Sequence, residues 1–297
     1  MSKNIFVSIV GRPNVGKSSL LNRLLGEKIA IVSDKPQTTR NRITGVLTEG
    51  ETQYVFIDTP GLHKPKSKLG QFMTKQASAS VSDVDAVLVV TEWEGGVTTA
   101  EKQLIESIKN SRVPTVLAIN KVDALAQKEM MLKKIAAFAN LHTFDAVVPI
   151  SALKGEGVAT LLKELAPFCC EGEHFFPDDT LTDQPERAVV AEIIREKLLR
   201  NMRDEIPHGT AVVIEKMRER EDGSFIDIDA TIVCERDAHK GIIIGKHGTM
   251  LKKIATEARL DMERFLDVRI NLQCWVKVRE GWRDSDTQLK NFGFKEQ

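Results

Sequence analysis

The amino-acid sequence predicts an α/β protein built from two domains. Three observations lead to this fold class. A glycine-rich loop at Gly11–Ser18 separates an apolar run from an amphipathic stretch, apolar runs then alternate with amphipathic stretches as far as Phe168, and the order of elements changes after Pro185. At 297 residues the chain is also too long for one small core. We therefore expect a six-stranded mixed sheet between two layers of helices, followed by a small α+β domain.

Six strands are predicted in the first domain. Near-continuous apolar runs such as AVLVV and TVLAI are typical of strands buried on both faces of a parallel sheet. The connection Gly50–Thr52 is short enough only for a hairpin, so one edge of the sheet should be antiparallel. Ligands of such a sheet bind at the carboxyl ends of its strands. The predicted strands are Ile5–Val10, Ile43–Thr48, Gln53–Asp58, Ala86–Thr91, Thr115–Asn120 and Ala146–Ile150.

Five stretches of the first domain carry apolar residues at the spacing of a helix. The first helix begins directly after the glycine loop, so the positive end of its dipole should face whatever the loop holds. The predicted helices are Ser19–Leu25, Lys68–Val81, Ala100–Asn110, Lys128–Asn140 and Val158–Phe168.

Residues 169–184 interrupt the periodicity with glycine, proline and acidic residues, which is typical of a linker. We place the first domain at residues 1–170, the linker at 171–184 and the second domain at 185–297. The second domain has the order α–β–β–α–α–β, and a short helix ends it. Its predicted elements are Ala188–Met202, Ala211–Arg218, Phe225–Val233, two helices on either side of Gly245–Gly248, and Val268–Val278.

The composition is that of an ordinary globular protein, with 42% hydrophobic and 28% charged residues. The formal net charge is zero, so any nucleic-acid site must be local. The four cysteines show no metal-ligand spacing, which favours a reduced, cytoplasmic protein. The N-terminus enters directly into a strand and does not resemble a signal peptide, and no apolar run approaches the ~20 residues that span a bilayer.

The glycine loop, GRPNVGKS, has the spacing GxxxxGK[ST] of a phosphate-binding loop. Two of its residues are glycines without a Cβ, so the backbone N–H groups can point into one concavity. The lysine is expected to reach the β- and γ-phosphates, and the serine hydroxyl to hold Mg²⁺. The loop therefore indicates a nucleoside triphosphate. All eight residues are predicted to contact it: Gly11, Arg12, Pro13, Asn14, Val15, Gly16, Lys17 and Ser18.

A second motif, DTPG, ends the third predicted strand. An aspartate at such a strand end holds Mg²⁺, usually through water, and the following glycine donates its N–H to the γ-phosphate. Because that contact exists only while the γ-phosphate is present, the next stretch, Leu62–Gly70, is predicted to be a mobile switch. The residues expected at the nucleotide are Asp58, Thr59, Pro60, Gly61 and Leu62.

A third motif, Asn120-Lys121-Val122-Asp123, follows the fifth strand and selects the base. The Asp123 carboxylate can accept hydrogen bonds from guanine N1–H and from the 2-amino group. Adenine offers neither donor, so an adenine nucleotide should lose a few kcal/mol of binding free energy, because the carboxylate would stay unpaired. Lys121 would pack its stem over the ring, and Asn120 would tie loops together. The motif predicts a guanine nucleotide.

A fourth motif, the SAxxG stretch Ser151–Gly155, closes the sixth strand, and the N–H of Ala152 is placed to meet guanine O6. Its residues predicted at the nucleotide are Ser151, Ala152 and Leu153. In this order, each at the end of a strand, the four motifs resemble the translation-factor-like class of P-loop GTPases. The resemblance implies that Gln37–Arg40 is the first switch, in which a threonine hydroxyl completes the Mg²⁺ coordination; it favours Thr39, with Thr38 as the alternative. The implied metal ligands are Ser18, Thr39 and Asp58, and the implied catalytic residues are Lys17, Thr39, Asn14 and Gly61.

Leu62 follows DTPG where many GTPases carry a glutamine that orients the attacking water. In this class, GTPases with an apolar residue there often use a bound K⁺, held by the asparagine of the phosphate loop. Asn14 occupies that position. The alternative is that Asn14 only turns the loop. We expect slow hydrolysis in either case.

In the second domain the stretch Gly241–Leu251, GIIIGKHGTML, resembles a KH module of the type II order. In that module two glycines let a nucleic-acid backbone approach, while bases lie in an apolar groove. Arg236, Lys240 and Arg259 add to a local basic patch in a neutral protein. Trp275 lies in a strand and is expected in the core, whereas the sequence does not indicate whether Trp282 is buried or exposed. The predicted RNA-binding residues are Ile244, Gly245, Lys246, His247, Gly248, Lys252 and Lys253.

One GTPase domain followed by one type II KH domain resembles the Era family of bacterial ribosome-assembly GTPases. The resemblance implies a GTP hydrolase that uses GTP, GDP and Mg²⁺, with K⁺ as an additional ion. It implies binding to the 3′ end of 16S ribosomal RNA, action on the small ribosomal subunit, and association with the inner face of the membrane. We expect a monomer in which GTP–Mg²⁺ orders Gln37–Arg42 and Pro60–Gly70 and so changes access to RNA. The alternative is an RNA-binding adaptor whose nucleotide is structural.

Overall fold

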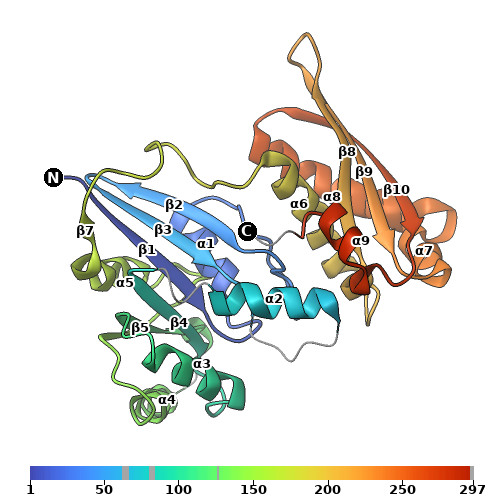
Figure 1. Cartoon of the computed structure of the whole chain (residues 1–297). Coiled ribbons are helices and arrows are strands. Elements are labelled where there is room, and N and C mark those ends of the chain that lie inside the picture. The colour runs from blue at the N-terminus through green and yellow to red at the C-terminus, as the bar shows by residue number, and fades with distance from the viewer. Residues whose placement is uncertain (62–66, 80–83, 126, 295–297) are drawn as a thin grey trace. The chain divides into compact units, whose positions relative to one another are not determined.

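The structure is a computed structural model that describes residues 1–61, 67–79, 84–125 and 127–294 (Figure 1). The described residues form two compact units. We call unit 1 the described residues of 1–30, 39–61 and 73–183, and unit 2 the described residues of 31–38, 67–72 and 184–294. Two short segments of the predicted first domain therefore belong by their contacts to unit 2. The predicted second switch falls partly on residues 62–66, which lie outside the described residues.

Unit 1 is built on a mixed sheet whose strand order is β2-β3-β1-β4-β5-β6. The β2–β3 pair is antiparallel and the remaining neighbours on this path are parallel, which confirms the predicted hairpin edge. These strands have the bounds β1 Lys3–Val10, β2 Ile43–Glu49, β3 Thr52–Asp58, β4 Ala86–Glu92, β5 Thr115–Asn120 and β6 Ala146–Pro149. The predicted mixed α/β fold is confirmed, and strand ends differ by two residues at most.

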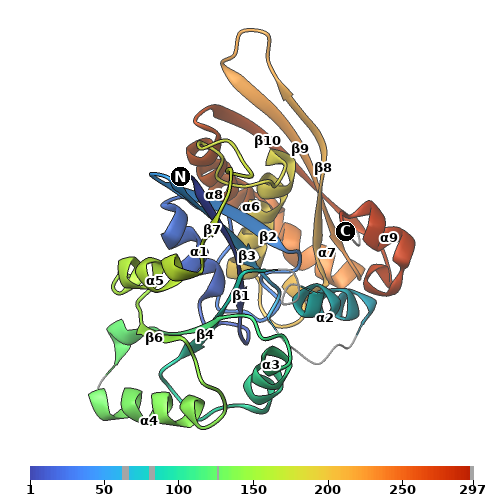
Figure 2. The same ribbon diagram turned by 60° about the vertical axis from the view of Figure 1, so that its left-hand side comes forward.

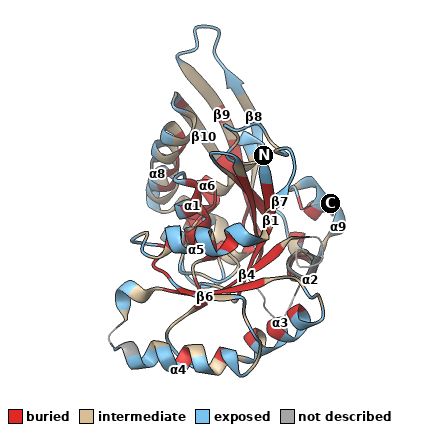
Figure 3. Cartoon of the chain, turned by 90° about the vertical axis from the view of Figure 1, so that its left-hand side faces the viewer, coloured by how far each residue is buried: buried red, intermediate tan, exposed pale blue. Residues whose placement is uncertain are grey.

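Helices cover both faces of this sheet (Figures 1 and 2). Their bounds are α1 Lys17–Leu25, α2 Lys68–Ala79, α3 Thr99–Lys109, α4 Lys128–Ala139 and α5 Val158–Leu165. Alternate residues of β4 enter opposite cores: Leu88 and Val90 pack with α1 and α5, while Val87 and Val89 pack with α3 and α4. A run of consecutive apolar residues thus fills two cores at once. Figure 3 shows β1 and β4 largely buried and much of α4 and α5 exposed on the outside.

The predicted linker is packed against the sheet for most of its length. A two-residue strand, β7 (Cys170–Glu171), pairs antiparallel with β1, so the six-strand prediction is one short. The Phe175 ring lies edge-on to Phe6, with ring centroids 4.9 Å apart. The Gln53 side chain accepts hydrogen bonds from the N–H groups of Phe175 and Phe176 at 2.9 and 3.0 Å. A strand this short, among glycine and acids, has no periodicity that a sequence pattern can detect.

Unit 2 holds the predicted α–β–β–α–α–β order. Its sheet has the order β10-β9-β8, with β9 and β10 parallel and β8 and β9 antiparallel. Helices α6, α7 and α8 pack on one face of this sheet through a shared apolar core. The bounds are α6 Glu186–Asn201, β8 Ala211–Glu219, β9 Phe225–Cys234, α7 Asp237–Ile244, α8 Thr249–Leu266, β10 Arg269–Val278 and α9 Asp286–Asn291.

The two tryptophans of unit 2 have opposite environments. The expectation that Trp275 belongs to the core is wrong, because its side chain is 45% exposed. Ile270 and Val276 of β10 face the helices, so the two-residue period turns Trp275 to the other face. Trp282 is fully buried, and its indole N–H donates to the Gly209 carbonyl at 3.0 Å.

In the part of the chain that the structure describes, no helix combines the length and apolar character needed to cross a bilayer.

Candidate functional site: a nucleotide cradle and a GxxG loop

The phosphate loop is shaped by glycines that no other residue can replace. Gly16 has φ +99°, and a Cβ there would lie 2.2 Å from the side-chain nitrogen of Asn120. A Cβ on Gly11 would lie 2.3 Å from the Val90 carbonyl oxygen. The loop is therefore pressed against the ends of β4 and β5, and α1 begins at Lys17, directly at the loop. The first-turn N–H groups of α1 face the ligand position that the sequence predicts.

Lys17 is buried within this loop. Its ammonium donates to the carbonyl oxygens of Gly11 and Arg12 at 3.1 and 3.2 Å. Burial lowers the pKa of Lys17 below its ordinary value, although the nearby Asp58 carboxylate acts in the other direction. An anion at the loop would stabilise the charged form of Lys17 and raise its pKa again, which is the role that a phosphate group would play.

The three predicted metal ligands lie together. Ser18 Oγ donates to Asp58 Oδ2 at 2.6 Å and lies 2.9 Å from Thr39 Oγ1, which lies 3.4 Å from the same carboxylate oxygen. Asp58 Oδ1 is buried without a hydrogen-bond partner among the described residues. Burial raises the pKa of Asp58, against the effects of Lys17 and the two hydroxyls. A buried carboxylate with an unused oxygen beside two hydroxyls fits Mg²⁺, a cation that prefers oxygen ligands.

The structure places Thr39, rather than Thr38, beside the other predicted ligands. The Thr38 hydroxyl instead donates to the Lys35 carbonyl at 2.6 Å and lies 2.7 Å from Ser33 Oγ. Asn14 is exposed in a left-handed conformation with φ +65°, which is compatible with either of its two predicted roles.

The DTPG motif lies against the phosphate loop. The Thr59 hydroxyl donates to the Ile9 carbonyl at 3.0 Å, and both Thr59 and Pro60 are buried. A Cβ on Gly61 would lie 2.8 Å from Pro13 N. Gly61 thus lies within contact distance of the loop at the edge where a γ-phosphate is expected. Leu62 lies outside the described residues.

The base-recognition motifs meet at the ends of β5 and β6. The Asn120 side chain donates to the Val15 carbonyl at 2.8 Å and accepts from the Ala152 N–H at 2.9 Å, so it does link three loops. The Ser151 hydroxyl donates to Asp123 Oδ1 at 2.6 Å. The Ala152 N–H was predicted to meet guanine O6. It already has Asn120 as a partner, so a guanine oxygen would have to share this donor. Val122 is half-buried, and Leu153 is 69% exposed.

The GxxG loop of unit 2 connects α7 to α8. Gly245 and Gly248 both have φ +75°, and a Cβ on Gly245 would lie 2.7 Å from Met250 Cβ. The side chains of Lys246, His247, Lys252 and Lys253 are exposed, and Ile244 is half-buried. The basic patch is smaller than its sequence suggests, because Arg259 pairs with Glu263 at 2.7 Å. The loop therefore offers two backbone positions without side chains, flanked by exposed basic side chains, of which Lys253 lies 3.9 Å from a carboxylate oxygen of Glu257.

Comparisons with known proteins agree with these two sites. Residues 6–121 match the family described as 50S ribosome-binding GTPase, and residues 205–283 match the KH domain. The chain is 51% identical over 296 residues to GTPase Era of Clostridioides difficile, covering 100% of both chains. It is 51% identical to GTPase Era of Ruminiclostridium cellulolyticum, covering 99% of this chain and 98% of that one. The chain belongs to the Era family of GTPases.

Two solved Era structures share this fold over the whole chain. One is Era in complex with MgGDPNP and nucleotides 1506–1542 of 16S ribosomal RNA, with a TM-score of 0.95 at 37% identity and 100% coverage of both chains. The other is a variant of Aquifex aeolicus Era bound to GDP·AlF₄⁻, with the same TM-score and identity, covering 99% of this chain and 100% of that one. The predicted combination of an Era-type GTPase domain and a KH domain is confirmed, and the protein is a GTPase that works with GTP, GDP and Mg²⁺.

Two residues at the nucleotide site of this Era-family GTPase belong to none of the sequence motifs. Arg23 on α1 donates to the carbonyls of Ala152 and Leu153 at 3.1 and 2.5 Å, and so holds the fourth motif in place. Glu92 ends β4 and pairs with both Arg12 and Lys121. The one available signal for Glu92 was its position at the carboxyl end of a strand, where ligands of such sheets bind.

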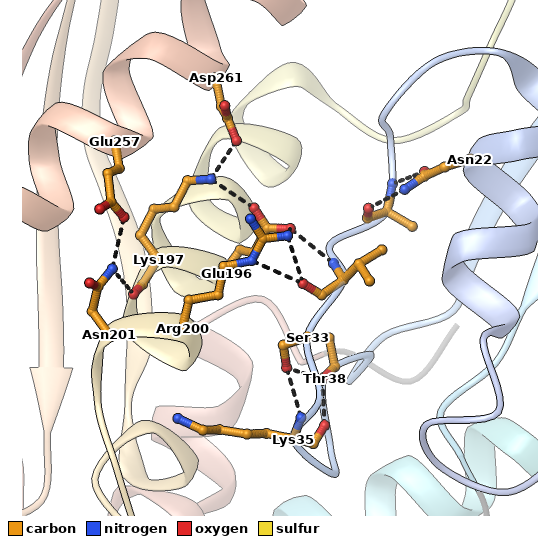
Figure 4. A network of polar contacts seen from close by, with 12 residues as sticks. Asn22, Ser33, Lys35, Thr38, Glu196, Lys197, Arg200, Asn201, Glu257 and Asp261 are labelled. Atoms are coloured by element: carbon orange, nitrogen blue, oxygen red, sulfur yellow. Dashed lines mark hydrogen bonds and ion pairs between the residues drawn. The ribbon is translucent and has the colours of Figure 1, made fainter. Parts of the chain in front are cut away.

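Within unit 2, the segment 31–38 of this GTPase is fastened to α6 (Figure 4). The Val32 N–H donates to Glu196, which is fully buried, at 3.0 Å. The Lys35 ammonium donates to two carbonyls at the C-terminal end of α6. Arg195 donates to the Thr38 carbonyl. Helix α6 of unit 2 therefore holds Thr38, the residue directly before Thr39.

Proposed function

We propose that this Era-family GTPase binds the 3′ end of 16S ribosomal RNA through its KH domain and acts in assembly and maturation of the small ribosomal subunit. The observation that supports this most is the GxxG loop, with its two side-chain-free backbone positions and exposed Lys246 and His247. A backbone phosphate can approach such a loop closely. One of the two solved Era structures with the same fold over the whole chain contains nucleotides 1506–1542 of 16S RNA.

A charge reversal tests the RNA site. Lys246→Asp should lower the affinity for a 3′-terminal 16S oligonucleotide by about a hundredfold in fluorescence anisotropy, since it replaces a phosphate contact by repulsion. Lys163→Asp, the same change at an exposed position on α5, is the matched control for overall charge. Equal losses for both variants would show that RNA is held by general electrostatics and not by the GxxG loop.

At the nucleotide site, each residue has a role that its geometry supports. Lys17 binds the β- and γ-phosphates, the Gly61 N–H meets the γ-phosphate, and Asp123 reads the guanine edge. Ser18, Thr39 and Asp58 would hold Mg²⁺, which neutralises charge on the phosphates. A single-turnover assay with GTP tests hydrolysis, and absence of any turnover would leave the protein an RNA-binding adaptor with a structural nucleotide.

We propose K⁺ as an additional ion at Asn14, because position 62 carries leucine and no side chain for orienting the attacking water is evident. Hydrolysis should then be several-fold faster in KCl than in NaCl at equal ionic strength, and Asn14→Ala should remove the difference. Equal rates in the two salts would mean that Asn14 only turns the loop.

Segment 31–38 supports a proposal about coupling. GTP–Mg²⁺ is expected to engage Thr39, and α6 holds the preceding residue through Arg195. Ordering of the first switch by GTP would therefore shift helix α6 of unit 2. That shift would change the affinity of the KH domain for RNA. This is allostery only if RNA affinity differs between the GTP and GDP states.

We propose a monomer in the cytoplasm, with peripheral association at the inner face of the membrane. All four cysteines are free thiols in the structure, as a reducing compartment would keep them. Light scattering after gel filtration tests the monomer, and flotation with lipid vesicles tests the membrane association.

A further inference from the structure

Glu92 joins the two halves of the nucleotide site. It is the last residue of β4 and lies beside Asn120 in the register of β4 and β5. One carboxylate oxygen pairs with the Arg12 guanidinium, and the other lies 2.5 Å from the Lys121 ammonium. Arg12 belongs to the phosphate loop and Lys121 to the base-recognition motif. One side chain therefore bridges two loops that contact opposite ends of a nucleotide.

The bridge continues to the N-terminus of α3. Arg12 Nε lies 3.5 Å from Glu101 Oε1, and the Glu101 side chain is only 2% exposed. Glu101 accepts from the Thr91 hydroxyl at 2.7 Å and from the Thr98 N–H at 2.8 Å in a capping box. Although burial opposes the charged form, the hydrogen bonds from Thr98 and Thr91 outweigh it, and the pKa of Glu101 lies below its ordinary value. Arg12 thus sits between two fixed carboxylates.

The backbone of Arg12 has a different task from its side chain. Its carbonyl accepts from the Lys17 ammonium at 3.2 Å, inside the phosphate loop. The backbone of Lys121 is in the left-handed conformation, with φ +67°, and its ammonium pairs with Glu92. In both residues, one part lies in the nucleotide site, while the charged end of the side chain pairs with Glu92. The Glu92 and Arg12 side chains are 18% and 26% exposed, so their pair is partly sheltered from screening by salt. Lys121 is 44% exposed, so its pair with Glu92 is less sheltered.

We infer that Glu92 is a positioning residue for guanine-nucleotide binding, which holds Arg12 and Lys121 and so fixes the phosphate loop and the base-stacking lysine relative to each other. A site that is fixed before binding loses less conformational freedom when the ligand enters. Loss of the bridge should appear chiefly in the dissociation rate of the nucleotide, since affinity changes among variants of one site arise mostly there.

Glu92→Gln keeps the shape and removes the charge. We expect fluorescent GDP to dissociate about tenfold faster from this variant. Glu94→Gln, the same change at an exposed position two residues beyond the end of β4, is the control and should match the unaltered protein. If the unaltered protein itself fails to bind GDP, the nucleotide site is wrong irrespective of Glu92. If Glu92→Gln and the unaltered protein release GDP equally fast, the positioning role is wrong.

A double-mutant cycle separates positioning from general loosening. Lys121→Met keeps the stem that packs on the base but removes the ammonium. If Glu92 acts through that ammonium, Glu92→Gln in the Lys121→Met background should add little to the rate, whereas independent effects would multiply. Arg12→Met gives the corresponding cycle for the phosphate loop. Multiplying effects in both cycles would overturn the inference, and the cycles for Lys121 and Arg12 remain informative if one variant folds poorly.

Binding of inosine diphosphate distinguishes loss of the Glu92 bridge from a general loosening of the base site. It lacks the 2-amino group that Asp123 is expected to accept from, so the ratio of GDP to inosine diphosphate affinity reports the Asp123 edge contact. Glu92→Gln should weaken both nucleotides by the same factor and leave the ratio unchanged, while Asp123→Asn should change it. A changed ratio in Glu92→Gln would show that the variant disturbs the whole base site instead of the bridge.

Discussion

At the scale of single residues, the firmest constraint is the space around Gly16. A Cβ there would lie 2.2 Å from the Asn120 side chain and would require φ +99° from an L-residue. Gly16→Ala should therefore push Asn120 away from the loop and reduce GDP affinity by at least a hundredfold in calorimetry. Gly26→Ala is the control: its φ is +74°, but its Cβ would meet nothing within 4 Å. It should cost about 1 kcal/mol of stability and leave nucleotide binding unchanged.

The two tryptophans of unit 2 give a second prediction at this scale. Trp282 is fully buried and packs on Phe292 with ring centroids 5.5 Å apart, so Trp282→Ala should lower the free energy of unfolding by about 3–5 kcal/mol. Trp275 is 45% exposed, and Trp275→Ala should cost about 1 kcal/mol or less. Urea denaturation followed by circular dichroism measures both. A larger loss for Trp275 would mean that its face of the sheet is covered.

At the scale of elements, the strand ends and the loop contacts of Asn120 were predictable, whereas the loop contacts of residues outside the motifs were not. The four nucleotide motifs are local, because each consists of consecutive residues after a strand, and the structure gathers Lys17, Asp58 and Asn120 at one edge. Glu92 and Arg23 belong to no motif, because their partners are distant in sequence. The partners of Glu92 lie 80 and 29 residues away, and those of Arg23 lie 129 and 130 residues away. The sequence pattern also did not predict strand β7, because only its pairing with the distant strand β1 defines it.

The segment 31–38 carries the prediction that belongs to this scale. Lys35→Ala removes the charged donor from the C-terminal carbonyls of α6. A charge-assisted hydrogen bond contributes about 1.5–3 kcal/mol, so local opening should become at least about tenfold more frequent. The Val32 N–H, held by the buried Glu196, should then exchange with solvent faster by that factor. Lys102→Ala on α3 is an exposed control, and equal exchange in all three proteins would show that Lys35 does not hold the segment.

At the scale of the whole molecule, the question is whether the nucleotide and the RNA influence each other. We propose that each binds mainly to a different unit. The chain passes from Thr38, which α6 holds, directly to Thr39, one of the proposed magnesium ligands. If GDPNP raises RNA affinity by some factor relative to GDP, thermodynamic linkage requires RNA to raise the preference for GDPNP over GDP by the same factor. We expect a factor of about 5–150, the usual range of such couplings.

Two independent measurements test this linkage. One compares the affinity for the 3′-terminal 16S oligonucleotide in GDPNP and in GDP, and the other compares the affinities for the two nucleotides with and without that RNA. The two ratios must agree, and Lys35→Ala should bring both toward one because it loosens segment 31–38 from α6. Identical RNA affinities in the two nucleotide states would remove the coupling, while leaving GTP hydrolysis and RNA binding as separate activities of one chain.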